Sequence, residues 1–267
     1  MDKKLILTEI QEICQKEGWT YQLNCKGKNW KADIVIEHPS MNIAFNVCKC
    51  PRNTESTYKI MLENNIICCW LLLPIDRYVD YDKNTPCFKL YNSNDQFKVT
   101  LYSSYYYDEG VSIDLTDFIY SFVEKKIKKA NNMIVQSAEV LFINYPCWKC
   151  NTDNHVYYIK RLQSNEGITI NDIDDENIIF NPQLVNAINL YIDNNGNNIK
   201  LGKIKQRYSK SSNDSDTSFG CINCDSIFGK VFVDDIIYED SYSQDIIHID
   251  MGKNEFQISV DCWYKEK

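Results

Sequence analysis

Two Cys-x-x-Cys pairs are the residues whose types and spacing indicate the most specific chemistry in this chain. The first pair is Cys147 and Cys150, and the second is Cys221 and Cys224. Each pair can form a tight turn, here called a knuckle, whose two sulfurs face one ion. Four such thiolates complete the tetrahedral shell of a structural zinc site. The spacing therefore predicts one zinc ion shared by the two pairs.

The residue after each knuckle supports this prediction. Such a turn often places this residue in the left-handed backbone region, where Gly is the usual choice and Asn and Asp tolerate the conformation next best. The residues here are Asn151 and Asp225. The 70 residues between the pairs exceed the usual zinc-ribbon spacing, so buried thiols without a metal stay open as the alternative.

The composition describes a folded protein of one large or two ordinary domains. The chain has 267 residues, of which 44% are apolar and 25% are charged, and these proportions exclude wholesale disorder. A formal net charge of -8 argues against a protein whose whole surface binds nucleic acid, since phosphate contacts need a local excess of Lys and Arg. Basic patches at residues 125–129 and 200–210 leave local binding open.

The distribution of apolar residues and cysteines predicts a cytoplasmic protein. No apolar run reaches the roughly 18 to 20 residues needed to span a bilayer, and residues 1–4 lead into an amphipathic pattern rather than a signal peptide. We therefore expect no membrane association. Thiols stay reduced in the cytoplasm, so the 12 cysteines predict metal binding or burial rather than disulfides.

Hydrophobic periodicity predicts an α+β fold in the N-terminal half. Residues 3–17 carry apolar side chains at helical spacing, and Gly18 follows them as a stop signal. Alternating or wholly apolar runs predict strands, and a second helical pattern lies between them. The expected order is helix, three strands, helix and strand, at residues 3–17, 20–25, 31–37, 43–48, 53–64 and 66–73.

This αβββαβ order resembles the restriction-endonuclease-like nuclease core, and short motifs add a closer resemblance. Lys-Ala-Asp-Ile at 31–34, Ile-Ala-Phe-Asn-Val-Cys at 43–48 and the run with Trp-Leu-Leu at 63–72 are similar to the nuclease-like domain of the competence protein CoiA family. Those proteins carry an Ala-Asp-Val strand, a strand with Phe-Glu-x-Gln and a strand ending in Trp-Leu. In the second half, Cys-Trp-Lys-Cys at 147–150 and the run 204–210 resemble their zinc-binding region.

The resemblance implies a PD-(D/E)XK-type site, in which carboxylates hold Mg²⁺ and the metal polarises the phosphate and generates hydroxide. Asp33 takes the position of the strand aspartate, and Glu9 or Glu12 supplies the acid of the first helix. Asn46 stands where the family has Glu, and Cys48 stands where it has Gln or, in other nucleases of the fold, Lys. A neutral Asn weakens a hard-cation site, so a degenerate catalytic site is favoured over an active one.

The expected domains are a nuclease-like domain at 1–112, a connecting helix and linker at 113–140, and a zinc-ribbon-like, mainly β domain at 141–267. Within the last domain, the apolar run at 228–233 predicts a strand directly after the second knuckle.

Three functions stay open at this point. The first is a CoiA-like protein with a nuclease fold that acts on or binds DNA and has a degenerate catalytic site. The alternative is a non-catalytic, zinc-stabilised module that binds protein or nucleic acid. A third is a zinc-stabilised scaffold without a nucleic-acid role, which the negative net charge favours. Whether the chain is an enzyme depends on the residues around Asn46.

Overall fold

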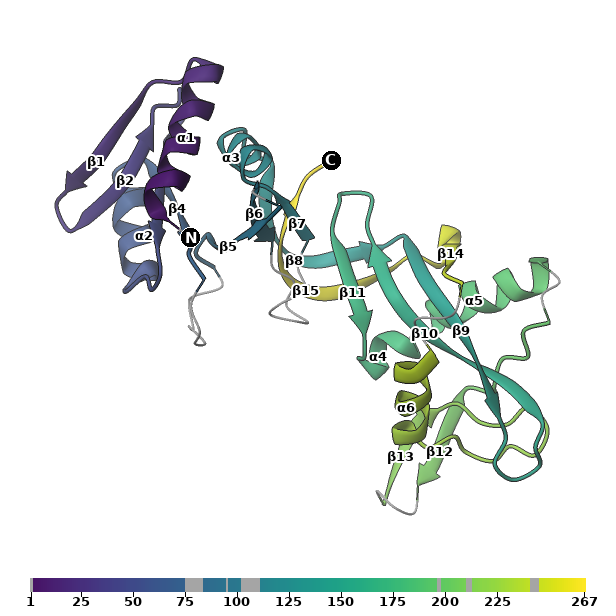
Figure 1. Cartoon of the computed structure of the whole chain (residues 1–267). Helices are drawn as coiled ribbons and strands as arrows, with labels where there is room; N and C mark the ends of the chain where they lie inside the picture. Colours follow the sequence, from purple (N-terminus) through teal and green to yellow (C-terminus); the bar gives the residue numbers. More distant parts are fainter. Residues whose placement is uncertain are drawn as a thin grey trace. The chain divides into compact units, whose positions relative to one another are not determined.

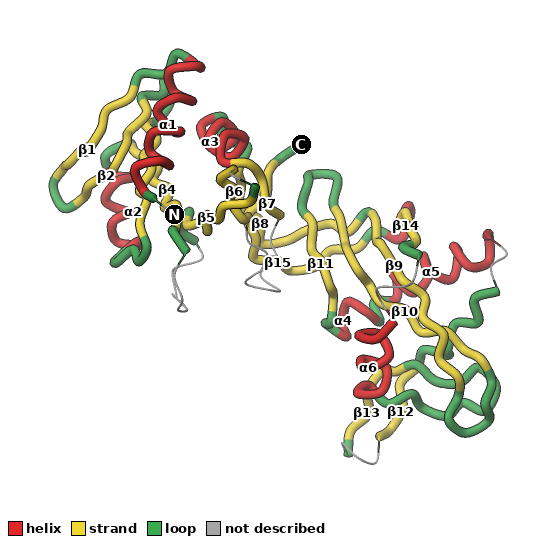
Figure 2. Tube along the Cα trace, in the orientation of Figure 1, coloured by secondary structure: helices red, strands yellow, loops and turns green. Residues whose placement is uncertain are grey.

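The structure is a computed structural model that describes residues 2–74, 84–94, 96–101, 111–195, 198–209, 213–240 and 245–267. The chain forms two compact units (Figure 1). Unit 1 comprises residues 1–131 and 260–267, and unit 2 comprises residues 132–259. Strands make up much of both units, with several helices among them (Figure 2), so the expected α+β class is confirmed. Among the described residues, no helix is long and apolar enough to cross a membrane.

A seven-stranded sheet forms the centre of unit 1, and its strands lie side by side in chain order. The first three are an antiparallel meander, whereas β3, β4 and β5 run parallel. The helix α2 (Thr54–Glu63) connects β3 to β4, as a parallel pair requires. The strands are β1 (Tyr21–Gly27), β2 (Trp30–Ile36), β3 (Asn42–Cys48), β4 (Ile66–Leu72), β5 (Cys87–Ser93), β6 (Gln96–Leu101) and β7 (Val111–Asp114).

The helix α1 (Lys3–Glu17) precedes this sheet, so the expected order of helix, three strands, helix and strand is confirmed. The side chain of Asp2 caps its first turn by accepting a hydrogen bond from the Lys4 amide at 2.8 Å. Gly18 ends the helix with φ of 70°, a left-handed conformation that glycine adopts without strain.

Both faces of the sheet are covered, because successive strand residues point to opposite sides. On one face, Ile34 and Ile36 of β2 join a core that includes buried residues of α1 and of α3 (Leu115–Val123). On the other face, Val35 packs in a smaller core with Met61 of α2. The β2 strand is therefore buried on both faces of the sheet.

The helix α3 belongs to unit 1, although the sequence predicted a connecting helix in a linker at 113–140. Phe118 is fully buried, and its ring centroid lies 4.9 Å from that of Phe88 on β5. The chain then continues in β8 (Ile127–Val135), which pairs with β15 (Phe256–Lys265). Residues 260–267 also return to unit 1. The boundaries differ from those expected because the apolar face of α3 completes the first core.

Unit 2 is built on a four-stranded antiparallel sheet in the order β11-β10-β9-β14. A separate hairpin, β12 (Lys205–Ser209) with β13 (Asp214–Ser218), lies between the two knuckles in the sequence. The remaining elements are β9 (Ser137–Pro146), β10 (Asp153–Gln163), β11 (Thr169–Ile173), α4 (Glu176–Ile179), α5 (Pro182–Asn195), α6 (Lys230–Asp240), β14 (Ile247–Asp250) and the 3-10 turn η1 (Gly252–Asn254). The strand predicted at 228–233 is wrong, because α6 begins at Lys230.

Replacing Phe118 by Ala tests the assignment of α3 to the core of unit 1. We expect Phe118→Ala to lower the free energy of unfolding by about 3 to 5 kcal/mol, because it leaves a cavity among buried aromatic rings. Tyr120→Ala on the same helix is the control, since this side chain is 41% exposed and should cost about 1 kcal/mol. Urea unfolding measures both values, and equal losses would contradict the assignment.

Candidate functional site

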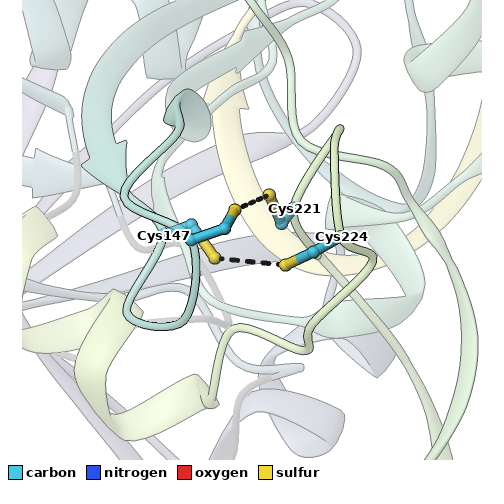
Figure 3. Close-up of side chains that lie close together, drawn as sticks. Cys147, Cys221 and Cys224 are labelled. Carbon is cyan, nitrogen blue, oxygen red and sulfur yellow. Dashed lines mark hydrogen bonds between the residues drawn. The ribbon is translucent and has the colours of Figure 1, made fainter.

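The four predicted cysteines converge in unit 2. Their sulfur atoms all lie within 4.8 Å of one another. Cys147 Sγ faces Cys224 Sγ at 3.6 Å, and Cys150 Sγ faces Cys221 Sγ at 3.5 Å. Figure 3 labels both residues of the first contact, and Cys221 of the second. A tetrahedral ion with Zn–S bonds of about 2.3 Å needs sulfurs about 3.8 Å apart. The arrangement therefore fits a metal ion such as zinc.

A backbone hydrogen bond holds the first sulfur of each knuckle. The amides of Lys149 and Asn223 donate to Cys147 Sγ and Cys221 Sγ at 3.5 and 3.3 Å. Asn151 and Asp225 close the two turns with φ values of 57° and 59°. The left-handed conformation predicted for these two residues is confirmed, and the matched geometry brings two sulfurs of each knuckle to one side.

The protonation of the thiols differs within the cluster. Thr152 Oγ1 lies 3.2 Å from Cys150 Sγ, and this hydrogen bond lowers the pKa of Cys150 to about 5. Burial raises the pKa of Cys147 to about 11. A bound divalent cation stabilises thiolates, so metal binding would release the proton that Cys147 otherwise keeps at neutral pH.

Asn154 is a site residue that the sequence analysis missed. Its side chain is fully buried and contacts both knuckle segments. Its Nδ2 donates to Thr152 O at 2.7 Å, and its Oδ1 accepts from the Ile222 amide at 2.8 Å. An Asn four residues after a Cys-x-x-Cys pair is a weak signal by itself, because only the fold brings Ile222 to it.

Arg207 on β12 also holds the second knuckle in place. Its guanidinium donates to Asp225 Oδ1 at 2.8 Å and to the Ser218 carbonyl at 2.5 Å. Lys205 also pairs with Asp225, and these cations hold the pKa of Asp225 at about 2. A Cβ atom at Gly220 would lie 2.3 Å from Arg207 Nη2, so only glycine leaves room for the guanidinium. Arg207 therefore binds the second knuckle and is only 8% exposed.

Unit 1 brings together three of the residues predicted for the nuclease-like site. Asp33 on β2 and Asn46 on β3 are adjacent, because Asn46 Oδ1 accepts from the Asp33 amide at 3.1 Å. The Asp33 carboxylate accepts from the Val47 amide at 2.8 Å and from Lys3 Nζ at 2.7 Å. Cys48 lines the same cavity, and burial raises the pKa of its thiol to about 11.

The structure places the two predicted helix glutamates outside the lining of this cavity. Neither Glu9 nor Glu12 lines it, and Lys3 is the residue of α1 that reaches Asp33. Burial raises the pKa of Glu9, Glu12 raises it further, and a hydrogen bond from Thr116 of α3 opposes them. Glu9 therefore faces α3. Among the described residues, the four cysteines are the only group of three or more potential metal ligands.

The cavity has a volume of about 850 Å³ and is lined mainly by three segments of the chain. They are the β1–β2 hairpin, the last residues of β3 and residues 50–52, which follow β3. Four cationic side chains line it against one carboxylate, that of Asp33; the four are Lys3, Lys26, Lys31 and Arg52. The cavity thus carries an excess of three positive formal charges, whereas the whole chain carries -8.

Comparisons with known proteins found no relative of the chain. No family model, curated protein or solved structure matches the chain. Functional conclusions therefore rest on the residues and their geometry.

Replacing Asn154 by Ala tests its role at the four cysteines. We expect Asn154→Ala to weaken zinc binding by about 10- to 100-fold, as loss of an outer-shell hydrogen-bond partner typically does. Competition with a chromophoric chelator measures the affinity. Asn195→Ala, at an exposed position on α5, is the matched control and should leave the affinity unchanged. Equal affinities of the two variants would show that Asn154 does not position the knuckles.

Proposed function

We propose that the chain is a CoiA-like protein with a restriction-endonuclease-like fold in unit 1 and a structural zinc ion in unit 2. In this proposal unit 1 binds DNA and does not cleave it. The αβββαβ order, the parallel β3–β4 pair and the neighbouring positions of Asp33 and Asn46 support the fold assignment. Each agrees with what the resemblance implies.

The zinc assignment is supported by the chemistry of the donors. Four thiolate sulfurs favour zinc over hard cations, which bind oxygen ligands. A closed shell of four protein ligands is typical of a structural ion rather than a catalytic one. The ion would be held by Cys147, Cys150, Cys221 and Cys224, and it would supply folding free energy to unit 2.

The loss of catalysis follows from the partners of Asp33, and this observation carries the proposal. A Mg²⁺ site needs several oxygen ligands, including carboxylates. One Asp33 oxygen is bound to the Val47 amide, and the other is bound to the ammonium group of Lys3. The Asn46 oxygen accepts from the Asp33 amide, so it is not directed at an ion. Lys3 supplies the positive charge that the carboxylate requires, and the residues present do not fit Mg²⁺.

DNA binding is supported by the local charge of the cavity. Phosphate contacts depend on clustered Lys and Arg side chains, and the net charge of the whole chain does not oppose them when the cluster is local. The alternative, a protein-binding module, is favoured by exposed apolar side chains on α6. Val231, Phe232 and Tyr238 are 68%, 66% and 77% exposed.

The purified protein is expected to carry about one zinc ion per chain. Cys224→Ser should lose the ion and unfold unit 2, because structural zinc contributes on the order of 10 kcal/mol of binding free energy. Elemental analysis and hydrogen exchange measure the two effects. Cys262→Ser, which changes a buried thiol of unit 1, is the control and should retain the ion. A zinc-free protein with unchanged exchange in unit 2 would exclude the assignment.

The wild-type protein is expected to show no Mg²⁺-dependent cleavage of linear DNA. Asn46→Glu with Cys48→Gln and Lys3→Ala restores a carboxylate and removes the competing ammonium, so we expect this triple variant to bind Mn²⁺ at least about ten-fold more tightly. Calorimetry measures Mn²⁺ binding, and a gel assay measures cleavage.

The same triple variant with Asp33→Ala is the control and should lose the gained affinity. Efficient cleavage by the wild type that Asp33→Ala abolishes would contradict the proposal and make the chain an active nuclease. Cleavage that persists in Asp33→Ala would locate the activity elsewhere.

A further inference from the structure

We propose that the cavity beside Asp33 binds an unpaired nucleotide of a single-stranded nucleic acid, with the phosphates held by Lys26, Lys31 and Arg52 and a base against Trp30. This inference rests on the proposed function. It adds the location of the binding site and a preference for single-stranded nucleic acid. Nothing in the resemblance assigns these four residues a role.

The size of the cavity admits a nucleotide. Its volume of about 850 Å³ lies within the range of about 300 to 1,000 Å³ that is typical of small-ligand pockets. A base that enters the cavity to lie against Trp30 must leave the stack and the pairing of a duplex. A strand would therefore have to present a base that is free of its partner.

The cations of the cavity are not equivalent. Lys3 is neutralised by Asp33 at 2.7 Å. Lys26, Lys31 and Arg52 are exposed, and no ion pair is found for any of them within the described part of the chain. Lys26 and Lys31 come from the β1–β2 hairpin and Arg52 from the loop between β3 and α2, so a phosphate in the cavity can meet charges from two separate segments.

Trp30 provides an aromatic surface whose position is fixed. A Cβ atom at Gly27 would lie 2.2 Å from Trp30 Nε1, so the indole packs directly on the glycine backbone. The ring lines the cavity and is half-buried. Bases of any sequence stack on such rings. Asn24 and Asn29 line the cavity beside the indole, and their amide groups can donate to and accept from the edge of a base.

Fluorescence anisotropy of labelled oligonucleotides tests the inference on the full, zinc-loaded chain. The probes are an oligothymidine of about ten nucleotides, its uridine counterpart and a hairpin duplex. We expect both single strands to bind at least about ten-fold more tightly than the duplex. The two single-stranded probes distinguish DNA from RNA as the source of the nucleotide.

Charge reversal locates the site. Arg52→Glu and Lys31→Glu should each weaken single-strand binding by about ten-fold or more, and each should reduce its dependence on salt. Lys28→Glu is the matched control, because Lys28 lies in the turn of the same β1–β2 hairpin and does not line the cavity. Trp30→Leu should lose about ten-fold through stacking, and Trp30→Phe should retain most of the affinity.

Three outcomes would overturn the inference. They are equal binding of duplex and single strands, equal effects of Lys28→Glu and Lys31→Glu, and binding that Arg52→Glu leaves unchanged. In each of these the protein still binds nucleic acid, so the proposed function stands. Failure of the wild type to bind any probe overturns both. Arg52 lies in an exposed loop, so its variant tests the inference even if Trp30→Leu does not fold.

Discussion

The convergence of four sulfur atoms is the constraint on which unit 2 depends. The two knuckles are separated by 70 residues in the sequence, and their four sulfurs meet in one cluster. Asn154 and Arg207 contact the knuckles from the sheet and from the β12–β13 hairpin, so the geometry of the cluster is transmitted to both. The cluster thus joins the sheet and the hairpin beside an apolar contact of Tyr145 with Phe228, whose ring centroids lie 4.3 Å apart.

In unit 1, protein groups alone compensate the charge of a half-buried carboxylate. The carboxylate of Asp33 is held by an amide of the neighbouring strand and by an ammonium group, so its charge is compensated without an ion. The side chain of Asn46 joins β2 and β3 beyond their last paired residues, because its amide group accepts from the Asp33 amide and donates to the Lys31 carbonyl. Asn46 therefore holds the two strands together where the backbone ladder has ended.

Local patterns in the sequence predicted the knuckles and the order of elements in unit 1, because spacing, turn residues and periodicity are local properties. The partners of Asp33 and Asn154 were missed, since Lys3 and Ile222 reach them only through the fold. The strand predicted at 228–233 failed for another reason. Val233, Ile236 and Ile237 follow helical spacing. The apolar run at 228–233 ends before Ile236 and Ile237, so it does not contain the helical pattern.

The return of residues 260–267 to unit 1 makes unit 2 an insertion in the topology of the first. Trp263 packs against the ring of Phe88, with centroids 5.4 Å apart, so the first core lacks a contact until this segment is made. The ribosome must first synthesise residues 132–259, which takes on the order of ten seconds. During translation, a nascent unit 1 therefore exposes an incomplete apolar surface while the four clustered cysteines of unit 2 have already been synthesised.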